Sequence, residues 1–272
     1  MSPDPISPDG ATRSDPAPAT DPDLVAFAVD LVRRAGEFTL GHFRSAQLHV
    51  ETKADGSPVT IADRDAERLM REAIHLAYPH DSILGEEEPP HHGSSGRRWV
   101  IDPIDGTMAF TSGVGTYTNL LYLEDRHGPA VGVIGIPALG EIVAAGRGLG
   151  CTLNGVACRV SDIAAVEDAT LTTSGFEYWD RDALLRTRDS GLVMRTWGDG
   201  YGYALVASGR AEVMVDPITS FWDIAPCLVI IPEAGGRVSS LDGSLPKEPP
   251  NLVATNGLIH QDVLAVLNPS AS

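Results

Sequence analysis

The sequence has few cysteines, few aromatic residues and no long apolar run. Its three cysteines are Cys151, Cys158 and Cys227, with no CxxC pair, which argues against a disulfide framework and a structural zinc site. Small buried thiols in a reducing compartment fit better. No apolar stretch approaches the ~18 residues of a membrane span, and the N-terminus has no hydrophobic signal region. We therefore expect a cytoplasmic protein that does not enter a membrane.

Basic residues are also scarce. The 272 residues include 20 basic against 37 acidic side chains, for a net charge of −17. Nucleic acid and anionic membranes do not attract a polyanion, so neither is expected as the main partner. An anionic small-molecule substrate would need metal cations or a local set of hydrogen-bond donors. The length itself corresponds to one large or two small domains.

Several common site motifs are missing. The eight histidines form no HExxH or HxH arrangement, and the chain has no P-loop, no GxSxG elbow and no intact GxGxxG. The stretch "GRGLG" at 146–150 is better interpreted as a turn. These absences leave acidic side chains as the main candidates for a functional site.

The N-terminal half begins with a stretch that has little to bury. Residues 1–20 are rich in Pro, Ser, Asp and Ala and are interpreted as a disordered tail. An N-cap and an N1 proline at Asp21-Pro22 then start an amphipathic helix, and a second helix follows within residues 57–79. Four strands are expected at 98–102, 117–125, 128–138 and 140–148, separated by glycine and polar turns.

Helices and strands alternate beyond residue 150. Strands are expected at 169–175, 211–217 and 251–257, and helices at 179–191, 200–209 and 221–236. This succession predicts a layered α/β architecture. We expect two lobes, at 21–150 with the metal and phosphate site and at 151–272 with the substrate-specificity segment, and a cleft between them.

Two aspartates follow an apolar strand in "RWVIDPIDGT". Pro103 favours a turn that brings Asp102 and Asp105 around one point, and Gly106 allows a ligand to approach the backbone. A helix starting near residue 106 would favour an anion beside Thr107. The segment thus predicts a cation site beside a phosphate site, although a plain Asp-Gly turn is the alternative.

Three further acids lie near the ends of apolar or helical segments, and each has a simpler explanation. Glu86 belongs to an acidic run typical of a solvated loop, Asp63 can cap a helix with Thr60, and Asp223 is favoured at a helix start by the dipole. Together with Asp102 and Asp105 they supply oxygen ligands only. Such a set favours magnesium or manganese over zinc.

Five segments together resemble the inositol monophosphatase superfamily. They are "VTIAD" at 59–63, "GEE" at 85–87, "DPIDGT" at 102–107, "WD" at 222–223 and "EAGGR" at 233–237, and the resemblance extends from about residue 23 to the end. It implies an α/β (α+β) fold, the αβαβα sandwich of inositol monophosphatase and fructose-1,6-bisphosphatase. It also implies magnesium-dependent hydrolysis of a small phosphate monoester and a homodimer.

The resemblance also implies roles for individual residues. Two or three Mg²⁺ ions, with Mn²⁺ as a substitute, would be held by Glu86, Asp102, the Ile104 carbonyl, Asp105, Asp223 and, for a weaker site, Asp63. Thr107 and Glu86 would position and activate the attacking water, with Asp105 a further catalytic residue. The backbone N–H groups of Gly106 and Thr107 would hold phosphate oxygens.

The segment "WGDGYGYALVASGRAEVMVDP" resembles the histidinol-phosphate phosphatase branch of this superfamily. Asp199 and Asp216 would then pair with the ammonium and imidazole groups of histidinol phosphate, with Tyr201 or Trp197 nearby. Alternatively, Asp199 caps a helix and Asp216 lies in an Asp-Pro turn. An inositol-1-monophosphatase or a broad sugar-phosphate phosphatase is the alternative activity. A non-catalytic metal- or phosphate-binding regulator is the alternative of another class.

Overall fold

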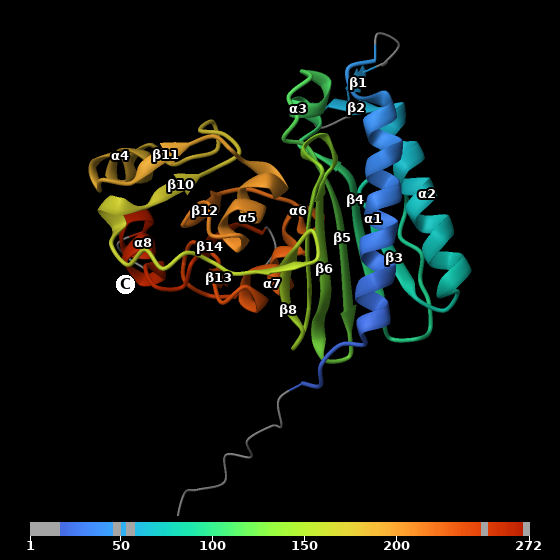
Figure 1. Cartoon of the computed structure of the whole chain (residues 1–272). Coiled ribbons are helices and arrows are strands. Elements are labelled where there is room, and N and C mark those ends of the chain that lie inside the picture. Colours follow the sequence, from blue (N-terminus) through green and yellow to red (C-terminus); the bar gives the residue numbers. More distant parts are fainter. Residues whose placement is uncertain (1–16, 46–49, 53–57, 246–249, 269–272) are drawn as a thin grey trace, which may run out of the picture.

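Two β-sheets alternate with three layers of helices in the computed structural model (Figure 1). The structure describes residues 17–45, 50–52, 58–245 and 250–268. From the α1 side, the layers are a helix pair, a seven-stranded sheet, a central helix layer, a five-stranded sheet and a second helix pair. The predicted αβαβα sandwich is confirmed.

The larger sheet is built from strands that follow one another in both sequence and space. The first pair is parallel, and every later pair is antiparallel. In order across the sheet the strands are β3 (Ser82–Gly85), β4 (Arg98–Asp105), β5 (Thr118–Asp125), β6 (Gly128–Ile136), β7 (Glu141–Gly146), β8 (Gly150–Leu153) and β9 (Val156–Cys158).

Two long helices, α1 (Pro22–His42) and α2 (Ile61–Ala77), cover one face of this sheet (Figure 1). Asp21 caps α1 by accepting from the backbone N–H of Asp23, as predicted. Thr60 and Asp63 form a capping box on α2. The apolar faces of both helices bury against Trp99, Leu121 and neighbouring strand residues. A short hairpin of β1 (Val50–Thr52) and β2 (Pro58–Thr60) lies between the helices in the chain.

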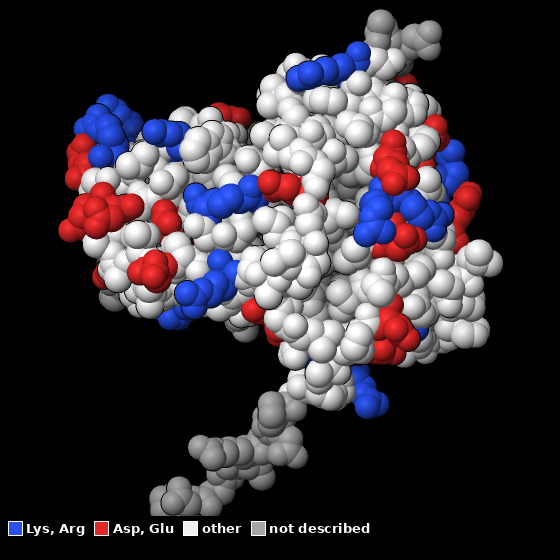
Figure 2. Space-filling model, in the orientation of Figure 1, with Lys and Arg blue, Asp and Glu red and all other residues white. Residues whose placement is uncertain are grey.

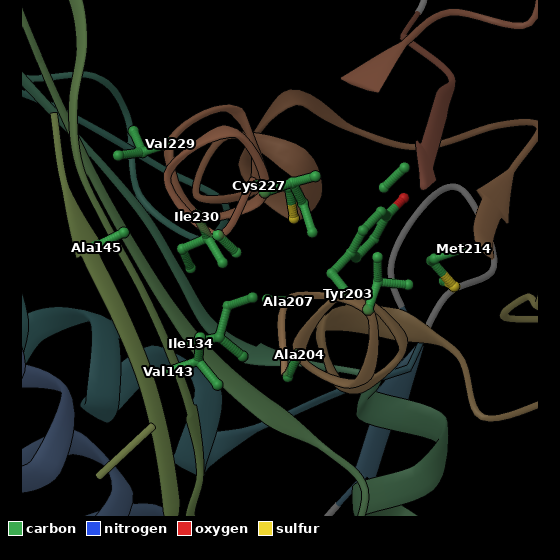
Figure 3. Close-up of a cluster of buried hydrophobic side chains, with 14 of the residues drawn as sticks. Ile134, Val143, Ala145, Tyr203, Ala204, Ala207, Met214, Cys227, Val229 and Ile230 are labelled. Atoms are coloured by element: carbon green, nitrogen blue, oxygen red, sulfur yellow. The ribbon is translucent and has the colours of Figure 1, made fainter. Parts of the chain in front are cut away.

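The central helices α5 (Asp199–Ala207), α6 (Phe221–Ile224) and α7 (Cys227–Glu233) pack between the two sheets. Figure 3 shows their core, in which Ile134 and Val143 of the larger sheet face Ala204 and Ile230. The single helix predicted over 221–236 is two helices, with a break at Ala225-Pro226. Pro226 lacks an N–H, which favours a break at this point.

The smaller sheet has the strand order β11-β10-β12-β14-β13. Its strands are β10 (Thr170–Thr172), β11 (Val193–Arg195), β12 (Val213–Asp216), β13 (Arg237–Ser239) and β14 (Leu252–Thr255). Helices α4 (Arg181–Asp189) and α8 (His260–Leu267) form its outer layer. The one-turn helix α3 (Thr107–Thr111) and the 3₁₀ turns η1 (Pro137–Leu139) and η2 (Val166–Asp168) complete the described elements.

Two predicted boundaries need correction. The boundary placed at residue 150 falls inside the larger sheet, because β8 and β9 extend this sheet to Cys158. The predicted tail, residues 1–20, includes a packed end. Thr20 is buried, and its Oγ1 donates to the Ala130 carbonyl oxygen at 3.0 Å. Residues 1–16 lie outside the described part of the chain.

The surface carries both signs of charge. On the face shown in Figure 2, acidic and basic side chains lie in small mixed groups. Ion pairs join some of the charged side chains of the described residues, such as Arg210 and Glu141 at 2.7 Å. Within the described ranges, every helix is too short or too polar to cross a membrane.

Candidate active site

The site begins at a bulge in β4. Asp102 pairs with Leu120 of β5 and Asp105 with Thr118, so the register shifts between them. A bulge removes ladder partners locally. The carbonyl of Pro103 is paired instead with the Asn119 side chain, whose Nδ2 donates to it at 2.5 Å. The chain then turns through Gly106, which has a left-handed φ of 76°, into α3. The bulge and turn bring both carboxylates to the same end of the sheet.

Three carboxylates converge at this point from two layers. Ligand oxygens of Asp102, Asp105 and Asp223 all lie within 4.8 Å of one another. Asp223 reaches the group from the first turn of α6, where it forms a capping box with Ser220 and its Oδ2 accepts from the Ser220 N–H at 2.7 Å. The structure thus brings together three of the predicted metal ligands.

The three carboxylates repel one another in a desolvated environment. Burial and the neighbouring charges of Glu86, Asp105 and Asp223 hold the pKa of Asp102 well above its usual range. Burial raises the pKa of Asp223 to about 7. Asp102 Oδ1 is buried and has no hydrogen-bond partner among the described residues. An unpaired buried carboxylate oxygen is costly unless a cation meets it, and oxygen-only donors suit magnesium. The residues present therefore fit a divalent cation.

Asp105 is held in place from two sides. Its Oδ2 accepts from Thr118 Oγ1 at 2.7 Å and from the backbone N–H of Gly200 at 2.5 Å. Thr118 belongs to the larger sheet and Gly200 to the central layer, so this carboxylate joins the two. Sequence analysis did not identify Thr118 or Gly200, because each acts only through a tertiary contact with Asp105.

Glu86 lies on a loop positioned by a second, fully buried acid. Glu67 on α2 accepts from the backbone N–H groups of Glu87 at 2.7 Å and Glu88 at 3.1 Å, and it pairs with Arg71 at 2.7 Å. A Cβ on Gly85 would lie 2.2 Å from Glu67 Oε1, so only glycine leaves room for this carboxylate. Sequence analysis missed Glu67. A glutamate on the mostly apolar inner face of an amphipathic helix could have marked it as a buried, functional acid.

Replacing Gly85 with Ala should displace the Glu67 carboxylate and with it the loop that carries Glu86. We expect kcat/KM for a phosphate monoester to fall by about tenfold to a hundredfold, because a small displacement of a positioned group is enough for such a loss. Steady-state kinetics measure it. Gly41→Ala is the control, since a Cβ there meets nothing within 4 Å and should leave kcat/KM unchanged. Equal rates for both variants would contradict the positioning role of Glu67.

Asp63 and Thr107 are neighbours across the site. Asp63 Oδ2 accepts from the N–H and hydroxyl of Thr60, at 2.7 and 2.6 Å, as the capping interpretation predicted. Its Oδ1 lies 3.4 Å from Thr107 Oγ1, which is also 3.0 Å from the Ile104 carbonyl oxygen. The Thr107 hydroxyl can therefore donate its proton to either oxygen and keep its lone pairs free to accept from another group.

The predicted substrate-specificity segment, residues 195–223, contains Asp199 and Asp216, and these two aspartates differ in burial and in hydrogen bonding. Asp199 has a left-handed φ of 55°, and its Oδ2 would lie 2.7 Å from a Cβ on Gly106, so its carboxylate faces the turn after β4. Asp216 is buried, and burial raises its pKa to about 6. Its Oδ1 accepts from Ser174 Oγ at 2.8 Å and its Oδ2 from Tyr203 at 2.9 Å. The Asp199 side chain is therefore more exposed than that of Asp216, and its carboxylate lies beside the Gly106 turn of the site.

The other side chains of this region differ in their hydrogen bonds and in their exposure. Ser174, which was missed, links the two aspartates, since its Oγ also accepts from the Asp199 N–H at 2.8 Å. Tyr201 is half-buried against the central core, whereas Trp197 is 44% exposed. The N-cap of α5 is Gly198, so Asp199 does not cap this helix.

The chain is similar to known proteins over most of its length. The inositol monophosphatase family pattern matches residues 21–270. A histidinol-phosphatase of Chlorobaculum parvum is 42% identical over 258 residues, which cover 90% of this chain and 96% of the relative. One from Mycobacterium tuberculosis is 38% identical over 256 residues, covering 90% and 98%. A solved IMPase of Thermotoga maritima superposes with a TM-score of 0.84 at 31% identity, covering 91% of this chain and 97% of that one. The chain belongs to the inositol monophosphatase family.

Proposed function

We propose that this protein is a magnesium-dependent phosphatase that hydrolyses L-histidinol phosphate to L-histidinol and phosphate. The convergence of Asp102, Asp105 and Asp223 within 4.8 Å carries the metal-dependent chemistry. Family membership and the relatives named histidinol-phosphatase support the reaction and the substrate.

The metal ions would be held by the oxygen ligands at the end of β4 and around it. Asp102, Asp105 and Asp223 form the centre, Glu86 and the Ile104 carbonyl complete it, and Asp63 supports a further ion. We propose two or three Mg²⁺ ions, with Mn²⁺ able to replace them. When bound, such ions lower the pKa of a water and offset the charge on the phosphate.

The residues around this centre orient the reactants. Thr107 Oγ1 can donate its proton to Ile104 or Asp63, so its lone pairs can accept a hydrogen bond from the attacking water. Glu86, on the loop fixed by Glu67, accepts a second one, and the two define the direction of attack. The N–H groups of Gly106 and Thr107 hold phosphate oxygens.

Residues of the substrate-specificity segment would bind the alcohol portion of the phosphate ester, which is histidinol. Histidinol carries an ammonium group and an imidazole. A carboxylate in the site favours such a cationic ligand over a neutral polyol such as inositol. Asp199 is the carboxylate that faces the site, and Ser174 links it to Asp216, which we propose as the second acidic group that favours a cationic ligand. Trp197 supplies an exposed aromatic surface, and Tyr201 supports the helix that carries Asp199.

Replacing Asp199 with Asn tests this recognition. We expect kcat/KM for L-histidinol phosphate to fall by about tenfold to a hundredfold, because a charged partner is lost in a desolvated site. The value for inositol 1-phosphate should change by less than about threefold. Asp182→Asn removes the same charge from an exposed position on α4 and should affect neither substrate. An equal loss on both substrates for Asp199→Asn would assign Asp199 to the common machinery instead.

The reaction itself is tested by phosphate release from L-histidinol phosphate with magnesium and then with a chelator. Turnover should require magnesium and return when the ion is restored. A folded protein that binds magnesium and phosphate yet hydrolyses no ester would instead be a binding regulator.

We further propose that the protein acts as a homodimer in the cytoplasm. The family resemblance supports the dimer, and the reducing cytoplasm suits the three free thiols. Light scattering after size exclusion measures the dimer directly, and a monomeric mass at working concentration would contradict it.

A further inference from the structure

Two cysteines lie opposite each other on the edge hairpin of the larger sheet. Cys151 of β8 and Cys158 of β9 are direct partners in the antiparallel register, and their Sγ atoms are 3.5 Å apart. Both thiols are free, Cys151 buried and Cys158 half-buried. The third cysteine, Cys227, is the first residue of α7 in the central helix layer (Figure 3). The proposed phosphatase mechanism uses none of the three.

The backbone geometry at this pair suits a covalent bond between the thiols. Direct antiparallel partners have Cα atoms about 4.5–5.5 Å apart, inside the range of about 4.4–6.8 Å that disulfides require. The two-residue turn Asn154-Gly155, with φ values of 50° and 78°, joins the strands and fixes their register. Rotation of the two side chains can therefore close the remaining gap between the sulfur atoms without moving the strands.

The two thiols are also chemically unequal. The hydrogen bond between the two thiols lowers the pKa of Cys158, burial opposes this, and the Arg210 guanidinium lowers it again. Arg210 is fixed by two bonds to Glu141, at 2.9 and 2.7 Å. A partly exposed thiol with a lowered pKa beside a cation is the more reactive nucleophile. Cys158 is therefore the attacking thiol, and Cys151 is positioned to resolve the product.

We propose that Cys151 and Cys158 form a reversible oxidation site, which a low-molecular-weight disulfide converts into a cross-strand disulfide. The Cys158 thiolate attacks one sulfur of the oxidant, which forms a mixed disulfide and releases one thiol. Cys151 then attacks Cys158 Sγ, which forms the intrachain bond and releases the second thiol. The pair loses two electrons and two protons, and the oxidant gains them as two thiols.

The disulfide would fasten the edge of the larger sheet. β9 is its terminal strand, and the chain leaves it for the smaller sheet directly after Cys158. The crossover is tied to the central layer by the Val160 N–H, which donates to the Ala234 carbonyl at 3.0 Å. A cross-link here restricts the unfolded chain, so we expect the melting temperature to rise by about 5 °C. The Asp102 centre lies on another strand, and kcat/KM should stay within about twofold.

The full-length protein, incubated with glutathione disulfide and then denatured, tests this site. We expect the three thiols to fall to one, with Cys151 and Cys158 joined in the mass map and dithiothreitol restoring all three. Cys227→Ala should still lose two thiols. Cys151→Ser should stop at a glutathione adduct on Cys158, and Cys158→Ser should leave Cys151 reduced. Three persistent thiols in the wild type, or an adduct on Cys158 that is never resolved, would overturn the proposal.

Discussion

We expect Asp105→Asn to lower kcat/KM for L-histidinol phosphate by at least about a thousandfold, equivalent to about 4 kcal/mol of transition-state stabilisation. The substitution keeps the shape of the side chain and an oxygen that can accept from Thr118 or Gly200, so the fold should persist. It removes one negative charge from the proposed metal-binding group of Asp102, Asp105 and Asp223. Steady-state kinetics with magnesium, together with circular dichroism, measure the loss and the retained fold.

A buried aspartate outside the site provides the matched control. Asp81 is as well buried, and it accepts from Arg97 Nε at 3.1 Å and from Trp99 Nε1 at 2.9 Å. Asp81→Asn should lower the melting temperature and leave kcat/KM within about threefold. If Asp105→Asn turned over at a near-normal rate, or if both variants lost activity equally, the assignment of Asp105 to the metal centre would be wrong.

Asp102→Asn should raise the melting temperature of the metal-free protein by about 5 °C at pH 7. Burial and three neighbouring carboxylates raise the pKa of Asp102 in the fold. A group whose pKa is raised in the fold contributes stability that is fully present below its unfolded pKa. This stability is lost as the pH rises through the folded value. At pH 7, well above the ordinary pKa of an aspartate, Asp102 must either carry its charge among the neighbouring carboxylates or take up a proton, and either costs stability that the amide does not lose.

Magnesium should stabilise the wild type more than Asp102→Asn. A ligand at a hundred times its dissociation constant adds about 2.7 kcal/mol to wild-type stability, a rise of about 5–10 °C in melting temperature. Asp102→Asn should respond by less than about 2 °C, because a ligand and its charge are missing. Differential scanning fluorimetry with chelator and with magnesium measures both. A metal-free Asp102→Asn protein less stable than wild type, or an equal magnesium response, would show that these carboxylates do not form a cation site.

The sequence pointed to the converging carboxylates of the proposed metal centre because these residues lie in short, local patterns. Asp102, Asp105 and the turn at Gly106 are contiguous, and the capping pairs of Asp63 and Asp223 obey rules of helix starts. The succession of periodic segments predicted a layered α/β architecture, and the αβαβα order came from the family resemblance. Local patterns were sufficient for these features because neighbours in the chain determine them.

The residues that hold the centre in place were not predictable in this way. Glu67, Thr118 and Ser174 act through partners 13 to 42 positions away, and nothing in their own segments marks them. The β8–β9 hairpin was missed as well, since its strands are only three or four residues long. Its omission placed the lobe boundary too early. Tertiary contacts decided each of these features.

The most direct test of substrate and site together is kcat/KM for L-histidinol phosphate and for inositol 1-phosphate, measured side by side with magnesium. We predict a preference of at least about a hundredfold for histidinol phosphate, equivalent to about 2.7 kcal/mol in transition-state binding. Equal values, or a preference for inositol 1-phosphate, would contradict recognition of the cationic alcohol by Asp199 and Asp216.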